Sequence, residues 1–307
     1  MANLKAIKNR INSIKSTQKI TRAMKMVASA KVKKFENRVK ASRPFTYELE
    51  KLFYRLLNSI DKIEAKTTNF KEPIYNFPIL LNERPIKNVG LLIMTSNKGL
   101  AGAFNANVVR YTLKTVEMYK EKGIGCELFI IGQKGYTPLK RSLEEYGYKI
   151  TQKYTNFGES PTSSQSLLIA KDMAKSFVNG DIDSMEIITT RFKNMMSYSV
   201  EKWDILPLDE LEEDYTNEEF TDMEVEPGLS SVMSELVPLF ISSIIFQAML
   251  ESSASELASR MTAMSAACSN ADEMIQKLTI DYNKVRQAVI TQELTEIVGG
   301  ASVNKKC

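Results

Sequence analysis

Two long stretches of the chain repeat their apolar residues at helical spacing. In the first, positions in steps of three and four share one register that is apolar at both ends and polar or small in the middle: Leu4, Ile7, Ile11, Ile14, Gln18, Thr21, Lys25, Ala28, Val32, Phe35 and Val39. The second register is more regular and comprises Leu257, Met261, Met264, Cys268, Ala271, Ile275, Leu278, Tyr282, Val285 and Val289. An ordinary core helix seldom exceeds about 25 residues, so about four heptads in one register predict a coiled coil.

Glycine and proline interrupt helices, and both are scarce in these two stretches. The first 56 residues hold one proline, Pro44, and no glycine, and neither type occurs between Pro238 and Gly299. We therefore expect helices over 3–56 and 238–298. Proline is tolerated in the first turn of a helix and glycine is common just after its last turn, so Pro238 and the glycine pair beginning at Gly299 are expected to mark the ends of the second helix.

The middle of the chain has a different pattern, in which short apolar runs alternate with amphipathic segments. The apolar runs predict buried strands at 89–95, 126–131 and 185–192. The amphipathic segments predict helices near 104–122, 137–146 and 163–178. This strand-helix order is typical of a small, mainly parallel α/β sheet covered by helices.

The lengths of these elements indicate how they are arranged. Helices over 3–56 and 238–298 would span about 80 and about 90 Å, whereas a domain of roughly 180 residues is only about 40 Å across. Both helices must therefore extend beyond the domain, and an antiparallel pair is the simplest way to bury both registers. We expect a first helix in 1–58, an α/β domain with an acidic linker in 59–230, and a second helix in 231–307.

The charge of the chain is strongly polarised although its total is small. The net charge is +4 over 307 residues. Residues 1–43 carry thirteen Lys or Arg against one acid, Glu36, a local net of +12, while residues 209–226 carry ten acids and no base. The basic helix could be a solvated face or could bind nucleic acid, a membrane surface or an acidic protein. The acidic stretch indicates a solvated linker.

The composition argues against catalysis by this chain. Histidine is absent, which removes the commonest general base and metal ligand. Cys126, Cys268 and Cys307 form no CxxC pair, so we expect neither a metal site nor a disulfide framework, and no cofactor. No signal or transit peptide is evident, and the apolar stretch at 238–250 is too short to span a bilayer.

One loop after the first predicted strand superficially resembles a phosphate-binding loop. Residues 96–102 read SNKGLAG and precede a helical pattern. A Walker A loop requires GxxxxGK[ST] and a dinucleotide fingerprint requires GxGxxG, and neither pattern is present. We interpret the segment as a tight turn before a helix.

Both long helices carry apolar residues outside their shared register. Ile20, Met24 and Val27 form a second stripe on the first helix, and beyond Val289 the second helix changes to a stripe that comprises Ile290, Leu294 and Ile297. Apolar stripes beside basic residues indicate a protein interface more than a nucleic-acid surface.

Several segments resemble the gamma subunits of bacterial F-type ATP synthases. The similar segments are KITRAMKMVASAK (19–31), SRP (42–44), SNKGLAGAFN (96–105), ESSASELASRMTAMSAACSNADEMI (251–275) and YNKVRQAVITQELTEIVGGA (282–301). The resemblance covers both termini and the first strand-turn-helix of the middle domain. It implies a long antiparallel coiled coil of the terminal helices with a central, small Rossmann-like parallel α/β domain.

The resemblance also implies a function and partners. Gamma subunits are non-catalytic rotors that turn inside a hexamer of alpha and beta subunits and sit with the epsilon subunit on the membrane c-ring. They couple the flow of protons or sodium ions to ATP synthesis or hydrolysis. The expected location is the cytoplasmic side of a bacterial cell membrane, as a peripheral protein without direct nucleotide binding.

The residues expected to contact the catalytic subunits follow from the same resemblance. In the family, the segment matching Arg22 to Val27 faces acidic loops of beta, and positions matching Arg286 to Glu293 bond to beta in one rotational state. The expected contact residues are Ile20, Arg22, Met24, Lys25, Val27, Arg260, Arg286, Gln287, Thr291 and Glu293. Flexible Met24 and Met26 suit a sliding surface, although ordinary helix packing would also explain them.

Two other functions are open at this point. A nucleic-acid-binding coiled coil would use the basic helix but leaves the apolar stripe and the middle domain unexplained. A nucleotide-dependent enzyme would use the middle domain, but no carboxylate pair, histidine or phosphate loop supports it.

Overall fold

The computed structural model describes residues 2–66, 84–145, 148, 150–157, 160–206, 226 and 229–304. The chain divides into two compact units, one made of Met1–Ser29 with Arg260–Cys307 and the other of Ala30–Ser259. The acidic stretch 209–226, apart from Glu226, and Cys307 lie outside the described residues. The sequence predicted three consecutive segments, 1–58, 59–230 and 231–307. The two compact units do not test this division, because each unit is defined by contacts and one of them combines both ends of the chain.

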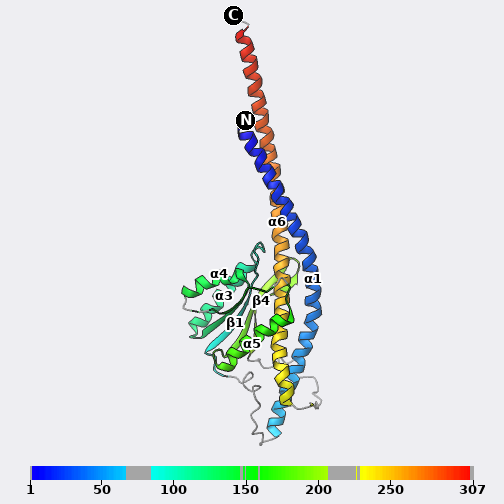
Figure 1. Cartoon of the computed structure of the whole chain (residues 1–307), viewed down its shortest axis with the longest axis vertical. Coiled ribbons are helices and arrows are strands. Elements are labelled where there is room, and N and C mark those ends of the chain that lie inside the picture. The colour runs from blue at the N-terminus through cyan, green and yellow to red at the C-terminus, as the bar shows by residue number, and fades with distance from the viewer. Residues whose placement is uncertain are drawn as a thin grey trace. The chain divides into compact units, whose positions relative to one another are not determined.

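The two long helices exist, and both are longer than predicted. Helix α1 spans Ala2–Lys66 and helix α6 spans Leu229–Asn304 (Figure 1). Pro238 was expected in the first turn of the second helix and the Gly299 pair at its end, and both expectations are wrong because α6 continues past each. Proline inside a helix removes one backbone hydrogen bond and crowds the carbonyl four residues before it, so the helix must be stabilised by other contacts. Pro238 is itself exposed while Leu236 and Val237 beside it are buried, so packing of the neighbouring residues sustains the helix.

The apolar composition of α6 reflects burial in a core. A window within residues 235–298 is apolar enough to cross a membrane by composition alone, but 72% of it is buried inside the structure. A mostly buried helix of a globular domain passes the same test, so the window is accounted for by the domain core.

The middle of the chain forms one five-stranded sheet in the larger unit. Its strands are β1 (Asn88–Met94), β2 (Gly125–Ile131), β3 (Ile150–Tyr154), β4 (Ser184–Asn194) and β5 (Ser197–Leu206). The order across the sheet is β3-β2-β1-β4-β5. The first four strands are parallel, and β5 pairs antiparallel with β4. The predicted α/β class with a mainly parallel sheet is confirmed.

The sequence patterns found three strands and missed the two at the edges of the sheet. Strand β3 has the sequence ITQKY and is exposed at its three central positions. Strand β5 mixes polar and apolar residues and is only half-buried along most of its length. An edge strand needs no continuous apolar run, since part of its surface stays in water. Neither strand contains a run of apolar residues long enough to be predicted from the hydrophobic pattern.

Three shorter helices connect the parallel strands: α3 (Phe104–Glu121), α4 (Gln133–Glu145) and α5 (Ser163–Asn179). Helix α4 begins four residues before its predicted start. The prediction placed the start too late because Gly135 and Pro138 interrupt the apolar pattern in the first turns of the helix. Gly135 is required there, because a Cβ atom would lie 2.4 Å from Thr95 Oγ1. Helix α5 ends at Gly180, whose φ of 81° is the left-handed conformation that glycine adopts without strain.

The two faces of the sheet have separate cores. Leu91 of β1 and Leu128 of β2 pack with residues of α3 and α4 on one face. On the other face, residues of α5, α6 and the second half of α1 cover the sheet, and Phe53 stacks on Phe240 with ring centroids 4.5 Å apart. The long helices are therefore structural parts of the α/β domain within residues 30–259.

Candidate functional site

The smaller unit is a pair of antiparallel helices, formed by α1 up to Ser29 and α6 from Arg260. Thr21 Oγ1 lies 3.1 Å from Cys268 Sγ, and the Gln18 side chain donates to Asp272. As the residue number increases along α1, the number of its contact partner on α6 decreases, so the two helices are antiparallel. Ile11, Ala28, Met264 and Ala271 of the predicted registers are buried, and the predicted coiled-coil pairing is confirmed.

The outer face of α1 carries the first group of predicted contact residues. Ile20 and Val27 are 60% and 56% exposed, and Arg22 is also exposed. Met24 and Lys25 are half-buried, so Met24 lies at the border between the seam and the outer stripe. Met26 is 62% exposed on the same turn. The structure thus exposes an apolar stripe and basic side chains in the same turns of the helix, and Arg22, two residues from both Ile20 and Met24, lies on a different side from the stripe.

The far end of α6 carries the second group. Arg286, Gln287, Thr291 and Glu293 are all exposed, whereas Arg260, near the start of the unit, is half-buried. The stripe predicted beyond Val289 is exposed, with the highest values at Leu294 and Ile297, and Ile280 and Val298 add to it: Ile280 67%, Ile290 48%, Leu294 58%, Ile297 68% and Val298 67%. Ile290, Leu294, Ile297 and Val298 form an apolar surface near the end of the helix, and Ile280 lies several turns before it.

The loop at 96–105 uses its own polar side chains to complete its backbone hydrogen bonds. Asn105 Oδ1 accepts the Ser96 N–H at 3.0 Å, and Asn97 Oδ1 accepts the Gln133 N–H at 3.0 Å. Leu100, at φ 65°, adopts the left-handed conformation, and Gly102, at φ 54°, does the same two residues later. This geometry is a tight turn, as the sequence indicated, and the Asn97 side chain links it to the start of α4.

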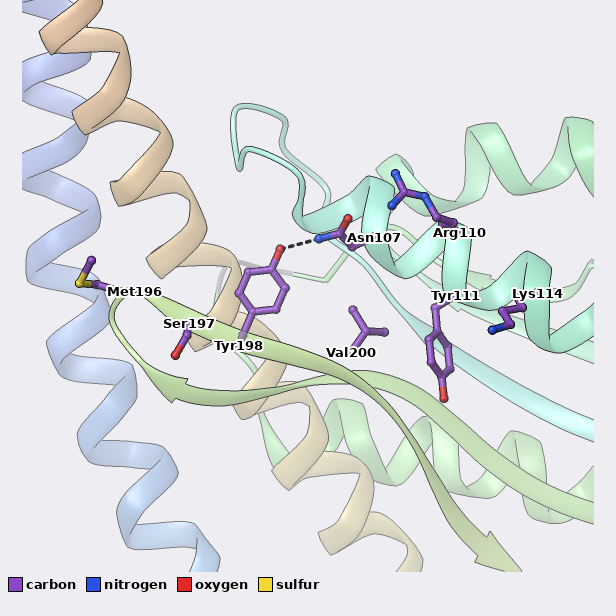
Figure 2. A pocket seen from close by; sticks show the side chains of 8 residues that line it. All are labelled: Asn107, Arg110, Tyr111, Lys114, Met196, Ser197, Tyr198 and Val200. Carbon is purple, nitrogen blue, oxygen red and sulfur yellow. Dashed lines mark hydrogen bonds between the residues drawn. The ribbon is translucent and has the colours of Figure 1, made fainter.

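A groove of about 530 Å³ lies between α3 and the start of β5, where it was not predicted (Figure 2). It is lined by Asn107, Arg110, Tyr111, Lys114, Met196, Ser197, Tyr198 and Val200. Asn107 donates to the Tyr198 hydroxyl at 3.3 Å across it. None of the lining residues is acidic, and Met196 is 87% exposed. Tyrosine, methionine and arginine are enriched in protein interfaces, so the groove has the composition of a polypeptide-binding surface rather than of a catalytic site.

A buried polar cluster joins α3 to the β4-β5 hairpin. The Tyr119 hydroxyl donates to Glu186 at 2.6 Å, and Lys202 Nζ lies 3.1 Å from the same carboxylate. Burial, with the hydrogen bond to Glu186, raises the pKa of Tyr119 well above its usual range. Burial and the nearby Glu186 raise the pKa of Cys126 to about 12, so this thiol stays protonated. The cluster is structural, and Cys126 lacks the thiolate character of a reactive cysteine.

The described residues hold no cluster of three or more potential metal ligands among His, Cys, Asp and Glu. Within the described part of the chain, the exposed features described above are apolar helix faces and one groove.

Comparisons with known proteins agree with this interpretation. The sequence matches the ATP synthase family model over residues 3–303. It is 36% identical to the ATP synthase gamma chain of Psychrobacter cryohalolentis and 35% identical to that of Haemophilus influenzae strain PittEE, in each case over 98% of this chain and 99% of the relative.

Solved structures with similar folds include central stalks. The Tetrahymena thermophila mitochondrial ATP synthase central stalk and c-ring structure contains a chain with a TM-score of 0.60 and 26% identity, covering 81% of this chain and 99% of that one. A chain of the Euglena gracilis mitochondrial enzyme has the same fold, with a TM-score of 0.63 at 18% identity over 98% of this chain and 94% of that one. The chain belongs to the ATP synthase gamma chain family, the central-stalk subunits of F-type ATP synthases.

Proposed function

We propose that the chain is the rotating shaft of an F-type ATP synthase, coupling ion flow through a membrane ring to ATP synthesis or hydrolysis in an alpha-beta hexamer. The observation that carries the proposal is the pair of antiparallel helices whose outer faces expose apolar stripes, at Ile20 and Val27 on α1 and at Leu294 and Ile297 on α6. Monomeric proteins seldom expose such apolar surface without a partner. A shaft without chemistry of its own accords with the absence of histidine.

The first proposed contact with the catalytic subunits is the outer face of α1. Ile20, Met24 and Val27 would supply the apolar contact, and Arg22 and Lys25 would attract acidic loops of the partner. Charge complementarity increases the rate and the specificity of docking more than its strength. Apolar side chains form contacts without directional hydrogen bonds, and methionine adapts its shape readily, which suits a surface whose partner changes during rotation.

The second proposed contact is the far half of α6. Arg286, Gln287, Thr291 and Glu293 are solvated in the free chain and can hydrogen-bond to a partner without first breaking buried bonds. Arg260, which is half-buried, would act near the start of the same unit.

The remaining partners and the location are part of the same proposal. An epsilon subunit and the c-ring would bind the α/β domain, and the complex would place this chain at the cytoplasmic side of a bacterial membrane. No direct nucleotide binding is expected, because the loop at 96–105 has neither the GxxxxGK[ST] nor the GxGxxG pattern of phosphate-binding loops. The coupling ion would be a proton or sodium.

The proposal is tested by reconstitution. The purified chain alone should hydrolyse no ATP, whereas its addition to the alpha and beta subunits, followed by assembly with the membrane sector in vesicles, should produce ATP-driven ion transport. Vesicles that lack this chain are the control. ATP hydrolysis by the chain alone, or ion transport without it, would contradict the proposal.

A further inference from the structure

Helix α6 carries a buried carboxylate directly after its longest apolar stretch, 238–250. Glu251 is 1% exposed. Two separate apolar clusters join α6 to α1 on either side of it: one includes Phe53 and Phe240, and the other includes Val32 and Leu257. A buried charge is costly unless its hydrogen bonds are satisfied, so its partners are expected to be specific.

All of the acceptor capacity of this carboxylate is used. Oε1 accepts Arg43 Nε at 2.8 Å and Gln247 Nε2 at 2.9 Å. Oε2 accepts Arg43 Nη2 at 3.0 Å and the Phe192 backbone N–H at 2.8 Å. An ionised carboxylate offers about four lone-pair positions. Four donors from α1, β4 and α6 therefore converge on one side chain.

Arg43 closes this junction from the side of α1. Its guanidinium binds Glu251 in a two-pronged fork and also donates to the Phe192 carbonyl oxygen at 2.9 Å. The hydrogen bond to Glu251 raises the pKa of Arg43 above its usual value. Pro44 follows directly and lacks the backbone N–H that would bond to the preceding turn. The fork thus holds α1 at a point where its own hydrogen-bond ladder is interrupted.

The geometry of the fork restricts a motion that apolar packing leaves free. Apolar burial is non-directional, so two packed helices can shift or rotate slightly with little change in buried area. A slip by one residue moves a helix about 1.5 Å along its axis and turns its side chains by about 100°. Such a slip would break every bond in the two-pronged arrangement, which has strict geometric requirements. The junction therefore fixes axial position and rotation together.

We propose that Arg43 and Glu251 are positioning residues that form a torsional joint, locking α1 and α6 to strand β4 so that, within residues 30–259, the two helices and the sheet turn as one body. The proposal rests on the rotor function proposed above. Glu251 is buried, whereas the Arg43 side chain is 45% exposed, and an ion pair that costs a buried charge its hydration is often no more stabilising than an apolar pair of similar size. The joint's contribution is therefore a defined rotation of the helices, and its loss lets α1 and α6 slip against strand β4 under torque.

The test uses the complete ATP synthase in vesicles with this chain carrying one of three changes. Arg43→Lys keeps the charge but loses the fork, because lysine has a single ammonium group. Glu251→Gln keeps an acceptor for the Phe192 N–H but loses the charge. The double variant Arg43→Met with Glu251→Gln removes the ion pair without leaving either charge unpaired. Tyr154→Phe, which removes a 2.7 Å hydrogen bond to Asp172 away from the joint, is the control.

Two quantities are measured for each variant: the unfolding temperature of the chain and the ratio of ions transported to ATP hydrolysed. The three joint variants are expected to assemble and hydrolyse ATP but to lose part of this ratio. The double variant should regain unfolding temperature relative to Glu251→Gln without regaining the ratio. Tyr154→Phe should lower the unfolding temperature and leave the ratio unchanged.

Other results would overturn the joint. If the ratio of ions transported to ATP hydrolysed follows the unfolding temperature across all four variants, the pair contributes only to stability. The same conclusion holds if this ratio stays normal in every joint variant. Failure of all joint variants to assemble, while Tyr154→Phe assembles, would make the pair a folding requirement. Failure of the rotor function itself is distinguishable, since the unchanged chain would then give no coupled ion transport.

Discussion

Helices α1 and α6 run through both compact units, and they are packed differently in each. Within residues 30–259 they bury Phe53, Phe240 and Ile245 against a sheet. Within the smaller unit the same two helices bury little beyond a narrow seam, and Ile20 and Leu294 are mostly exposed. One region is held by a core shared with other elements, while the other leaves apolar surface exposed. The comparison predicts that substitutions of apolar core residues in the first region will affect stability, and that substitutions of the exposed stripes in the second will affect assembly or coupling.

The largest expected difference concerns core residues. Phe53→Ala removes a ring that is fully buried and stacked on Phe240, and should lower the free energy of unfolding by about 3–5 kcal/mol. Ile20→Ala, at an exposed position on the same helix, should change it by about 0.5 kcal/mol or less in the isolated chain. Urea unfolding of both variants measures the two changes in the free energy of unfolding. Equal losses would show that the two regions share one core.

A charge on the border of the outer stripe should affect coupling. Met24→Lys would add a cation beside Arg22 and Lys25, and a partly desolvated charge-assisted bond to an acidic partner contributes roughly 1.5–3 kcal/mol. We expect normal assembly and hydrolysis but a lower ratio of ion transport to ATP turnover. The matched control is Met26→Lys on the exposed side of the same turn. Because Met24 is half-buried, separation of the two helices in Met24→Lys would instead assign residue 24 to the seam.

Acid should weaken the larger unit through Asp183. Burial alone would raise the pKa of Asp183, but hydrogen bonds from the backbone N–H groups of Asn88 and Lys87, together with Arg84, hold it below its usual value. A carboxylate whose pKa is lowered in the folded state contributes stability above its unfolded pKa of about 3.9, and this contribution is lost as the pH falls through the folded pKa. Asp183→Asn should therefore lower the unfolding temperature at pH 7 and flatten its decline below about pH 4. An unaltered acid profile would contradict this role.

The smallest expected effect is on the basic face of the smaller unit. Exposed ion pairs contribute about 0–1 kcal/mol each, and charges are screened over about 8 Å at 0.15 M salt. Raising the salt concentration should slow docking of α1 to the catalytic subunits, as measured by association rates at several ionic strengths. The unfolding free energy of the core should change far less. Association that is independent of salt would indicate purely apolar docking.

The sequence by itself determined the long helices, their antiparallel partnership and the central strands. A register that repeats every three and four residues identifies the buried seam of each helix, as Met264 and Ala271 illustrate, and the lengths of the two helices favour the antiparallel pair. A continuous apolar run such as the one at 128–131 requires burial on both faces. The loop at 96–105 was also predictable, since it lacks the glycine spacing of phosphate loops. These features depend on local spacing, which a sequence displays directly.

Tertiary structure alone decided the edges of the sheet, the ends of the helices and the polar junction. Strands β3 and β5 form because each can hydrogen-bond to a neighbouring strand, although few of their own residues are apolar enough to require burial. Helix α6 passes Pro238 because its neighbours are buried by elements distant in sequence. Glu251 could be noticed in the sequence as a charge directly after the apolar stretch 238–250, but its partner Arg43 lies 208 residues away. Such a pairing depends on which surfaces meet after folding, and spacing along the chain does not encode it.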